Sequence, residues 1–433
     1  MCCPCFYWLA VLCSSVIHGA EVWHLSSDGS QLLHHSYQQL LQLDWQTARF
    51  QTTAGELSID TTRIWRLAPA DETSPGPLPT ASRFALALVS GDRWFASALQ
   101  LQGEQYLLTL DERTKVQLPL EQVERLSYMQ PIPPGQLLVP AGPPPALSGD
   151  LAILANGDHL RGELTSFTED HWRFRTELGD LELRTTQLSE IEFDPLLTAV
   201  WQPPRQGWVV LLTTGDRVTV EDLQLAGPDQ FRCLLSGGER WLMPVSQVAL
   251  LEPFHPQQQP VSWQPVESAQ QRNYFGKDSS PMLNAAWGAQ PLRSCSAPTR
   301  SCALGIGTRS ASRITFRLPP QSASLLVEVS LDPRVRDRGA VLVRIEGQRG
   351  DTVQALQAPL LLDQARPAAL LGPLPIAQWE AISFITDFGP RADLDDLVNW
   401  CSPVIRRESP AATTDSDNVT TDELLENQKR STR

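Results

Sequence analysis

Apolar and polar residues alternate in short runs along the first half of the chain. The clearest runs are WRFRT (172–176) and LELR (181–184), where every second side chain is charged or polar. A period of two over about four to eight residues indicates a half-buried antiparallel strand. Gly179-Asp180 between the two runs supplies the backbone angles of a tight hairpin. The pattern therefore predicts short antiparallel strands joined by close turns.

This pattern recurs four times, at a spacing of about 60 residues. Each copy begins with a short strand and a turn motif, and these motifs are Asp28-Gly29, Gly91-Asp92, Asn156-Gly157-Asp158 and Gly215-Asp216. Pro-rich connectors separate the copies, so we expect four β repeats over residues 21–68, 83–129, 150–195 and 207–252. Stiff connectors of this kind allow either separate barrels on a string or barrels packed in pairs.

The third copy begins NGDHLRGEL (156–164). This start resembles that of Sm-like and SH3-like barrels, which implies a small, strongly bent barrel for each copy. Sm-like proteins often bind RNA. The net charge of this chain is −14, however, whereas nucleic-acid binding needs a basic surface. We therefore expect no nucleic-acid partner.

Residues 263–407 have a different texture. Apolar alternation marks strands at 314–318, 325–331, 340–345 and 381–386, and Gly and Pro turns separate them. Short strands without a helical period predict a β-sandwich. The expected fold class is therefore all-β.

Five motifs in this segment resemble, in the expected order, the NPCBM carbohydrate-binding modules that accompany glycoside hydrolase domains. They are GIGTRSASRITFRL (305–318), VEVSLDPRV (327–335), RGAV (338–341), TDFG (386–389) and DLVNW (396–400). The resemblance implies a jelly-roll-like sandwich that binds sugars, galactosides in some members, and that holds calcium in some. Arg309 stands where the family usually has His, Ser330 replaces Gly, Pro333 replaces the second Asp, and Asn399 replaces the last Asp.

A sugar site needs an aromatic face and planar polar groups. Arg309 is the candidate polar group, and the candidate platforms are Tyr274, Trp287 and Trp379. The alternative is that Arg309 is a surface residue and the Trp side chains belong to the core. No cofactor is required, and the one metal suggested is calcium. Its candidate ligands are Asp332, Asp387, Asp393, Asp395 and Asp396, although Asp in such loops commonly caps turns instead.

The first residues resemble an export signal. Residues 6–17 (FYWLAVLCSSVI) form an apolar core of signal-peptide length before Gly19-Ala20, which predicts a signal peptide over residues 1–20. The alternative is a buried first strand. The mature chain keeps four Cys, and Cys295 and Cys302 are the candidate disulfide, with four unpaired thiols as the alternative. We expect the protein to be secreted, periplasmic or in the cell envelope.

Catalytic signals are absent from the sequence. No His occurs from residue 256 to the end, and no phosphate-binding or dinucleotide motif is present. No apolar run outside the N-terminus is long enough to span a membrane, and the polar residues 408–433 are expected to form a disordered tail. The favoured function is an exported, non-enzymatic recognition or adhesion protein that binds a glycan. The alternatives are an envelope protein that binds other proteins, and, third, a glycoside hydrolase.

Overall fold

The computed structural model describes residues 20–69, 83–110, 114–128, 149–168, 170–272, 280–288, 290–296, 300–390 and 395–408. Their regular structure consists of β-strands and one-turn 3-10 helices, which confirms the predicted all-β fold class. Among them, no helix is long and apolar enough to cross a membrane. The described residues do not include 1–19 of the predicted signal peptide, 409–433 of the predicted tail, Tyr274 or Asp393.

Four similar units, here called repeats 1 to 4, precede the sandwich. Repeat 1 contains β1 (Ala20–Leu25), β2 (Leu32–Tyr37), β3 (Gln39–Leu43), β4 (Thr47–Thr52), β5 (Gly55–Asp60), η1 (Thr61–Arg63) and β6 (Ile64–Ala68). Repeat 2 contains β7 (Phe84–Leu88), β8 (Arg93–Ala96), β9 (Ala98–Gln102), β10 (Gln105–Thr109), β11 (Lys115–Pro119), η2 (Leu120–Gln122) and β12 (Val123–Tyr128). Repeat 3 contains β13 (Asp150–Leu154), β14 (His159–Phe167), β15 (His171–Thr176), β16 (Gly179–Arg184), η3 (Thr185–Gln187) and β17 (Leu188–Glu192). Repeat 4 contains β18 (Gly207–Leu212), β19 (Arg217–Leu225), β20 (Gln230–Leu235), β21 (Arg240–Pro244), η4 (Val245–Gln247) and β22 (Val248–Phe254).

Each repeat closes on itself because its first strand pairs antiparallel with its last. The second strand bends so that its two halves pair with different neighbours. In repeat 3, β14 pairs with β13 up to Gly162 and with β15 from Glu163 onwards. A Cβ atom at Gly162 would lie 2.4 Å from the carbonyl oxygen of Arg175, so the bend requires glycine. The inward residues, among them Trp172 and Phe174, join one apolar core that runs through all four repeats.

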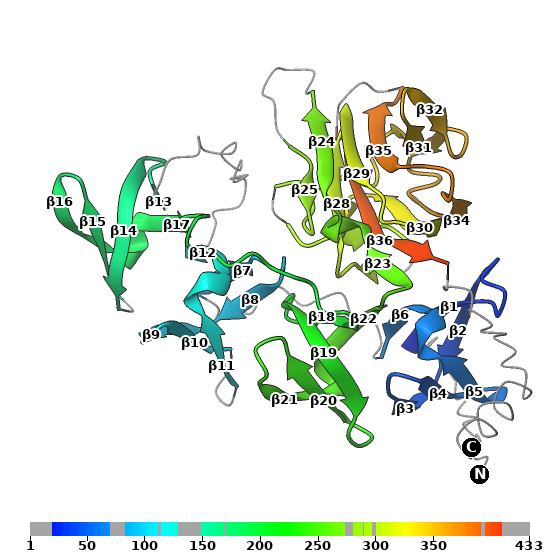
Figure 1. The fold of residues 1–433 in the computed structure, drawn as a ribbon, viewed down its shortest axis with the longest axis horizontal. Helices are drawn as coiled ribbons and strands as arrows, with labels where there is room; N and C mark the ends of the chain where they lie inside the picture. Colours follow the sequence, from blue (N-terminus) through cyan, green and yellow to red (C-terminus); the bar gives the residue numbers. More distant parts are fainter. Residues whose placement is uncertain are drawn as a thin grey trace, which may run out of the picture.

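The repeats pack edge to edge and not as separate beads. Strand β12 of repeat 2 pairs with β17 of repeat 3, β8 of repeat 2 with β19 of repeat 4, and β22 of repeat 4 with β6 of repeat 1. These pairings merge strands of all four repeats into one 16-stranded sheet in the described part of the chain. The spatial order of the repeats is therefore 3, 2, 4, 1, with repeat 3 at one end of the row (Figure 1).

Repeats 2 and 4 meet through two of the predicted turns. Asp216 Oδ1 accepts a hydrogen bond from the backbone N–H of Phe95 at 2.6 Å, and Asp92 Oδ2 accepts one from the N–H of Thr219 at 2.9 Å. Each Asp thus caps the backbone three positions after the equivalent Asp of the other repeat. The two contacts are reciprocal, which gives this junction an approximate two-fold symmetry.

The sandwich consists of two six-stranded sheets. The inner sheet contains β23 (Gln258–Pro260), β25 (Met282–Leu283), β28 (Gly305–Arg309), β30 (Ser322–Leu331), β34 (Ala368–Pro375) and β36 (Leu397–Arg407). The outer sheet contains β24 (Val266–Gln271), β29 (Ser312–Arg317), β31 (Val341–Arg349), β32 (Thr352–Ala355), β33 (Leu360–Leu362) and β35 (Ala381–Phe388). A small hairpin, β26 (Arg293–Ser294) and β27 (Arg300–Ser301), and the 3-10 turns η5 (Val261–Trp263) and η6 (Pro333–Val335) complete it. Its core includes Phe316, Phe384 and Trp400.

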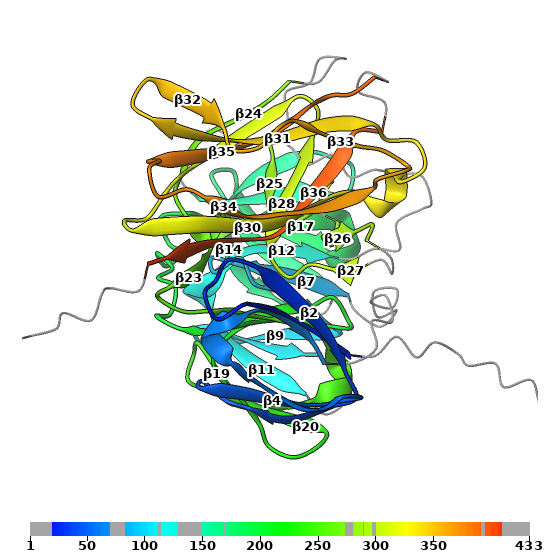
Figure 2. The same cartoon turned by 90° about the vertical axis from the view of Figure 1, so that its right-hand side faces the viewer.

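The inner sheet packs directly on repeats 1 and 4 (Figure 2). One apolar cluster joins the two parts. It contains Trp23, Trp65, Val209, Leu250 and Phe254 from the repeats, and Ala303, Leu304, Leu326 and Val404 from the sandwich. The indole N–H of Trp65 also donates to the carbonyl oxygen of Ser402 at 3.1 Å. The sandwich is therefore continuous with the repeats and shares a core with them.

Charged groups are buried in this interface. Arg66 Nη2 lies 2.6 Å from Glu328 Oε2, and its guanidinium lies between the rings of Trp23 and Trp65 at 4.5 and 4.3 Å. Burial alone would raise the pKa of Glu328, but the charge of Arg66 and hydrogen bonds bring it below its usual value. Glu252 accepts hydrogen bonds from Ser402 Oγ and the N–H of Ala303 at 2.5 and 3.2 Å. Its burial raises its pKa to about 7.

Candidate ligand-binding sites on the sandwich

Arg309 and Trp287, two of the predicted sugar contacts, lie together at one end of the sandwich. Arg309 ends β28, and Trp287 follows β25, which pairs with β28. The guanidinium carbon of Arg309 lies 5.5 Å from the centroid of the Trp287 ring, which is within cation–π range. Both residues are half-buried. The planar guanidinium is thus held over the aromatic ring.

Glycine in the GIGTR motif makes this approach possible. A Cβ atom at Gly307 would lie 2.4 Å from the carbonyl oxygen of Ala285 and 2.7 Å from Ala286. The backbone before Trp287 therefore passes over β28 in direct contact with its main chain. Any larger residue at Gly307 would push this segment, and Trp287 with it, away from Arg309.

Arg334 supports Trp287, and sequence reasoning missed this residue. Its Nη2 donates to the carbonyl oxygen of Trp287 at 2.8 Å, while its Nε and Nη2 donate to the two carboxylate oxygens of Asp332 at 2.7 and 2.9 Å. The amide of Asn399 donates to Asp332 as well, at 3.1 Å. Asp332 is thus held in an ion pair that positions the Trp287 loop. The signal in the sequence was Asp332-Pro333, since Asp332 caps the 3-10 turn η6 and so places Arg334 beside its own carboxylate.

The other candidate calcium ligands that the structure describes also have protein partners. Asp387 Oδ2 accepts from Arg344 at 3.3 Å, Asp395 lies 3.3 Å from Arg338, and Asp396 accepts from Ser310 Oγ at 2.7 Å. The described residues contain no group of three or more His, Cys, Asp or Glu side chains arranged to hold a metal ion. Since the described carboxylates do not converge, they do not fit a calcium site, which needs about six oxygens around one point.

Trp379 lies apart from Arg309 and Trp287. It is 9% exposed, and its ring packs over Gly347, where a Cβ atom would lie 2.4 Å from the ring. It lines an open cleft of about 490 Å³ together with Arg317, Gln348 and Glu380. Arg309 precedes β29 and Arg317 ends it, so this cleft is at the opposite end of that strand. Trp379 is therefore mainly a core residue and cannot act with Arg309 in one site.

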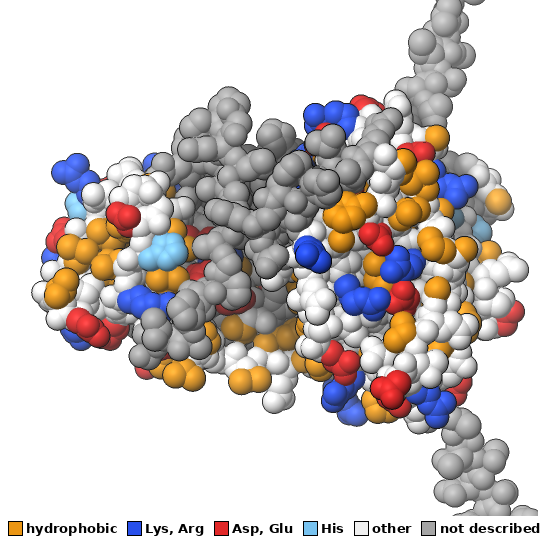
Figure 3. Space-filling view, turned by 90° about the horizontal axis from the view of Figure 1, so that it is seen from above, with side chains coloured by type: hydrophobic (Ala, Val, Ile, Leu, Met, Phe, Trp, Pro, Cys, Tyr) orange, Lys and Arg blue, Asp and Glu red, His pale blue; other side chains and the backbone are white. Residues whose placement is uncertain are grey.

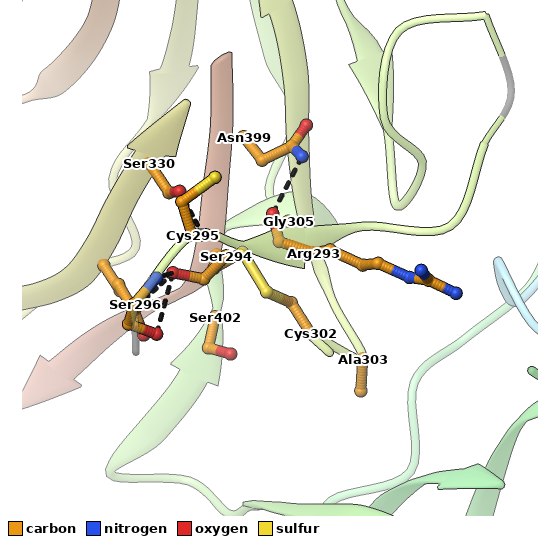
Figure 4. Close-up of a disulfide and its surroundings, with 12 residues drawn as sticks. Arg293, Ser294, Cys295, Ser296, Cys302, Ala303, Gly305, Ser330, Asn399 and Ser402 are labelled. Atoms are coloured by element: carbon orange, nitrogen blue, oxygen red, sulfur yellow. Dashed lines mark hydrogen bonds between the residues drawn. A yellow bond between two sulfur atoms is a disulfide. The ribbon is translucent and has the colours of Figure 1, made fainter. Parts of the chain in front are cut away.

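The disulfide differs from the predicted pair. Cys302 is bonded to Cys401, with a Cα–Cα distance of 5.5 Å, while Cys295 and Cys233 are free and buried. Figure 4 shows Cys295 beside Ser330, whose Oγ accepts from the N–H of Cys295 at 2.6 Å. The prediction of Cys295–Cys302 was wrong because it rested on nearness in sequence. In the fold, the segment after β27 brings Cys302 against β36, which carries Cys401.

The face of the sandwich seen in Figure 3 carries positive, negative and apolar side chains in close alternation. The exposed charges there are interspersed, without an extended patch of one sign.

No family model and no curated protein matches the chain. Among solved structures, it is similar to a Clostridium perfringens ZmpB structure containing CBM51-2 with GlcNAc and INT domains, at 15% identity over 41% of this chain and 36% of that chain, with a TM-score of 0.30. The chain thus spans little more than a third of that structure's length. A CBM51 from Clostridium perfringens GH95 in complex with methyl-galactose matches at 14% identity over 34% of this chain and 99% of that chain, with a TM-score of 0.29. Tandem CBM51 modules of Sp3GH98, a family 98 glycoside hydrolase from Streptococcus pneumoniae, match at 7% identity over 60% of this chain and 88% of that chain, with a TM-score of 0.26.

Proposed function

We propose that this chain is an exported, non-enzymatic recognition protein whose sandwich binds a glycan at Arg309 and Trp287. The observation that carries the proposal is that these two residues come from separate segments and meet at 5.5 Å. A guanidinium offers parallel N–H donors to neighbouring hydroxyls, and an indole ring offers an apolar surface to the C–H groups of a sugar. The Arg334–Asp332 ion pair holds the Trp287 loop in place in the absence of ligand.

Export is supported by the Cys302–Cys401 bond, because disulfides persist mainly in oxidising compartments. Periplasm, cell envelope and secretion all meet this condition. Sequencing the N-terminus of the protein from its native host tests it. A mature chain that begins near Glu21 is the expected result, and intact Met1 on cytoplasmic protein would contradict it.

A glycan array probed with the full chain tests ligand binding, followed by calorimetry with the best glycan. Arg309→Ala removes a charge-assisted hydrogen bond worth about 1.5–3 kcal/mol, so binding should weaken roughly ten- to a hundredfold. Arg349→Ala, which removes an exposed arginine at the end of β31, is the matched control and should bind normally. Equal affinity of all three proteins would remove Arg309 from the site.

The alternative is an envelope protein that binds other proteins and no sugar. The interface between the sandwich and repeats 1 and 4 favours it, because a sandwich fixed to its neighbours also serves as structural support. An array without any bound glycan, together with recovery of an envelope protein in cross-linked complexes, would favour this alternative. A hydrolysis screen with the full chain addresses the third candidate, a glycoside hydrolase.

A further inference from the structure

The junction between repeats 2 and 4 defines a way in which two repeats can join. It uses the first residues of each second strand, where Arg93 of β8 lies opposite Arg217 of β19. The Gly-Asp turns before these residues supply Asp92 and Asp216, which cap each other's strand. Both Asp side chains are buried at the junction.

Repeat 3 carries the same elements at a free end of the row. Its turn is Gly157-Asp158, followed by His159 at the position of Arg93 and Arg217. Asp158 accepts a hydrogen bond from the side chain two positions earlier, Asn156, as Asp216 does from Thr214. The backbone therefore presents the Asp158 carboxylate in the same turn geometry as at the internal junction.

The outer side of this strand is exposed. Before Glu163, β14 has β13 as its neighbour on one side, and the described residues place no strand on the other. Asp158 and His159 are exposed, whereas Asp92 and Asp216, the residues equivalent to Asp158 at the internal junction, are buried. Figure 1 shows repeat 3 at the end of the row, away from the sandwich.

Repeat 1, at the other end of the row, does not offer an equivalent edge. Its turn is Asp28-Gly29, and Ser30 stands after the glycine where the other repeats have Asp92, Asp158 and Asp216, so repeat 1 lacks the capping carboxylate at this position. Leu32, the first residue of β2, packs against the apolar cluster under the sandwich. Among the described residues, β14 is thus the one second strand that has both the Gly-Asp turn and an unpaired side.

We propose that two copies of this chain associate through the edges of β14, with His159 of one copy opposite His159 of the other. A second copy is the occupant that the structure favours, because at the internal junction the equivalent turns and strands of repeats 2 and 4 pair with each other. The contact is isologous, so it closes into a dimer and does not grow into a filament. Unpaired strand edges without Pro or Lys are open to such pairing. The edge is short, so the dimer should be weak and concentration-dependent.

Cysteine cross-linking tests the pairing geometry. In the full chain, His159→Cys places two thiols opposite each other across the two-fold axis, within the Cα separation that a disulfide spans. Mild oxidation should yield a covalent dimer that reduction reverses. Leu178→Cys is the control, since Leu178 is fully exposed at the β15–β16 turn of the same repeat. A dimer from Leu178→Cys but not from His159→Cys, or from neither variant, would overturn the proposal.

Sedimentation velocity of the wild-type chain, without any engineered cysteine, tests the association itself. The average sedimentation coefficient should rise with concentration over roughly a hundredfold range. His159→Glu puts like charges opposite each other and should abolish the rise, whereas Leu178→Glu should leave it intact. Both substitutions are at exposed positions, so thermal melting should show unchanged folding. A wild-type chain that stays monomeric, or a rise that persists in His159→Glu, contradicts the proposal. Neither result bears on glycan binding at Arg309.

Discussion

Arg66 of repeat 1 and Glu328 of the sandwich form an ion pair that is almost fully withdrawn from water. Their closest atoms are 2.6 Å apart, and the two side chains are 3% and 5% exposed. Two parts of the chain that differ in fold each contribute one charge that would be unstable alone. Because neither side chain has access to water, separating the sandwich from the repeats would leave two buried charges without their partners.

Removing one partner of this pair should be costly. Glu328→Ala leaves the guanidinium of Arg66 buried without its counter-ion, and we expect a loss of about 3–5 kcal/mol in the free energy of unfolding. Denaturant unfolding of the full chain measures it. The control is Glu56→Ala, which breaks the exposed pair of Glu56 with Arg49 and should change stability little. Equal effects of the two substitutions would show that burial of the Arg66–Glu328 pair does not matter.

The sandwich should not be stable when cut out of the chain. A fragment of residues 256–408 exposes Leu304, Leu326 and Val404, which are buried against the repeats, and leaves Glu328 without Arg66. We expect it to melt well below the full chain or to aggregate. Circular dichroism melting of the fragment and the full chain compares them directly. A fragment that melts at the temperature of the full chain would show that the two parts fold independently.

The strands of this protein were accessible from sequence because their signals are local. The runs at 172–176 and 181–184 alternate with a period of two, and the structure has β15 and β16 there. The predicted turn motifs also lie in hairpins, and Gly157 and Gly215 have positive φ angles of 88° and 90° there. Alternation and turn chemistry act within a few residues, so the sequence displays them directly.

The contacts between the repeats, and between the repeats and the sandwich, could not be predicted from the sequence. Nothing near Arg66 in the sequence indicates Glu328, and Asp92 and Asp216 were visible as turn residues but not as caps for each other. Such pairings depend on how strand edges meet, which is decided by tertiary packing. Only part of the candidate site could be predicted from the sequence. Arg309 and Trp287 were singled out by residue type, whereas the role of Arg334 depends on a loop crossing that only the fold reveals.

Peptide mapping should find Cys302 linked to Cys401. Digestion under non-reducing conditions is expected to yield one linked peptide containing both residues, with Cys295 and Cys233 recovered as free thiols. Burial raises the pKa of the Cys295 thiol to about 11, so it should react slowly with alkylating reagents in the folded chain.

The Cys302–Cys401 disulfide closes a loop with a sequence separation of 99, so replacing both residues by Ala should lower the free energy of unfolding by about 2–5 kcal/mol. A linked peptide containing Cys295 would contradict this assignment.

Glu252 should make the stability of the chain depend on pH near neutrality. Its pKa is about 7 in the folded chain and near its ordinary value of 4.5 when unfolded, because folding buries it. Between these values the folded chain binds more protons than the unfolded chain, so the Glu252 contribution to stability falls as pH rises from about 4.5 to about 7. Below this window both states are protonated, and above it the full cost of the buried charge remains.

The variant Glu252→Gln removes this titration and keeps an oxygen that accepts from Ser402 and Ala303. Its stability relative to wild type should therefore increase across the window, by on the order of 3 kcal/mol at about 1.4 kcal/mol per pKa unit. Denaturant unfolding at several pH values from about 4.5 to 7.5 measures the difference. The matched control is Asp229→Asn, at an exposed position of the same repeat, and its difference from wild type should stay flat. If the difference for Glu252→Gln is also flat, Glu252 is not the group that titrates at the interface between the sandwich and the repeats.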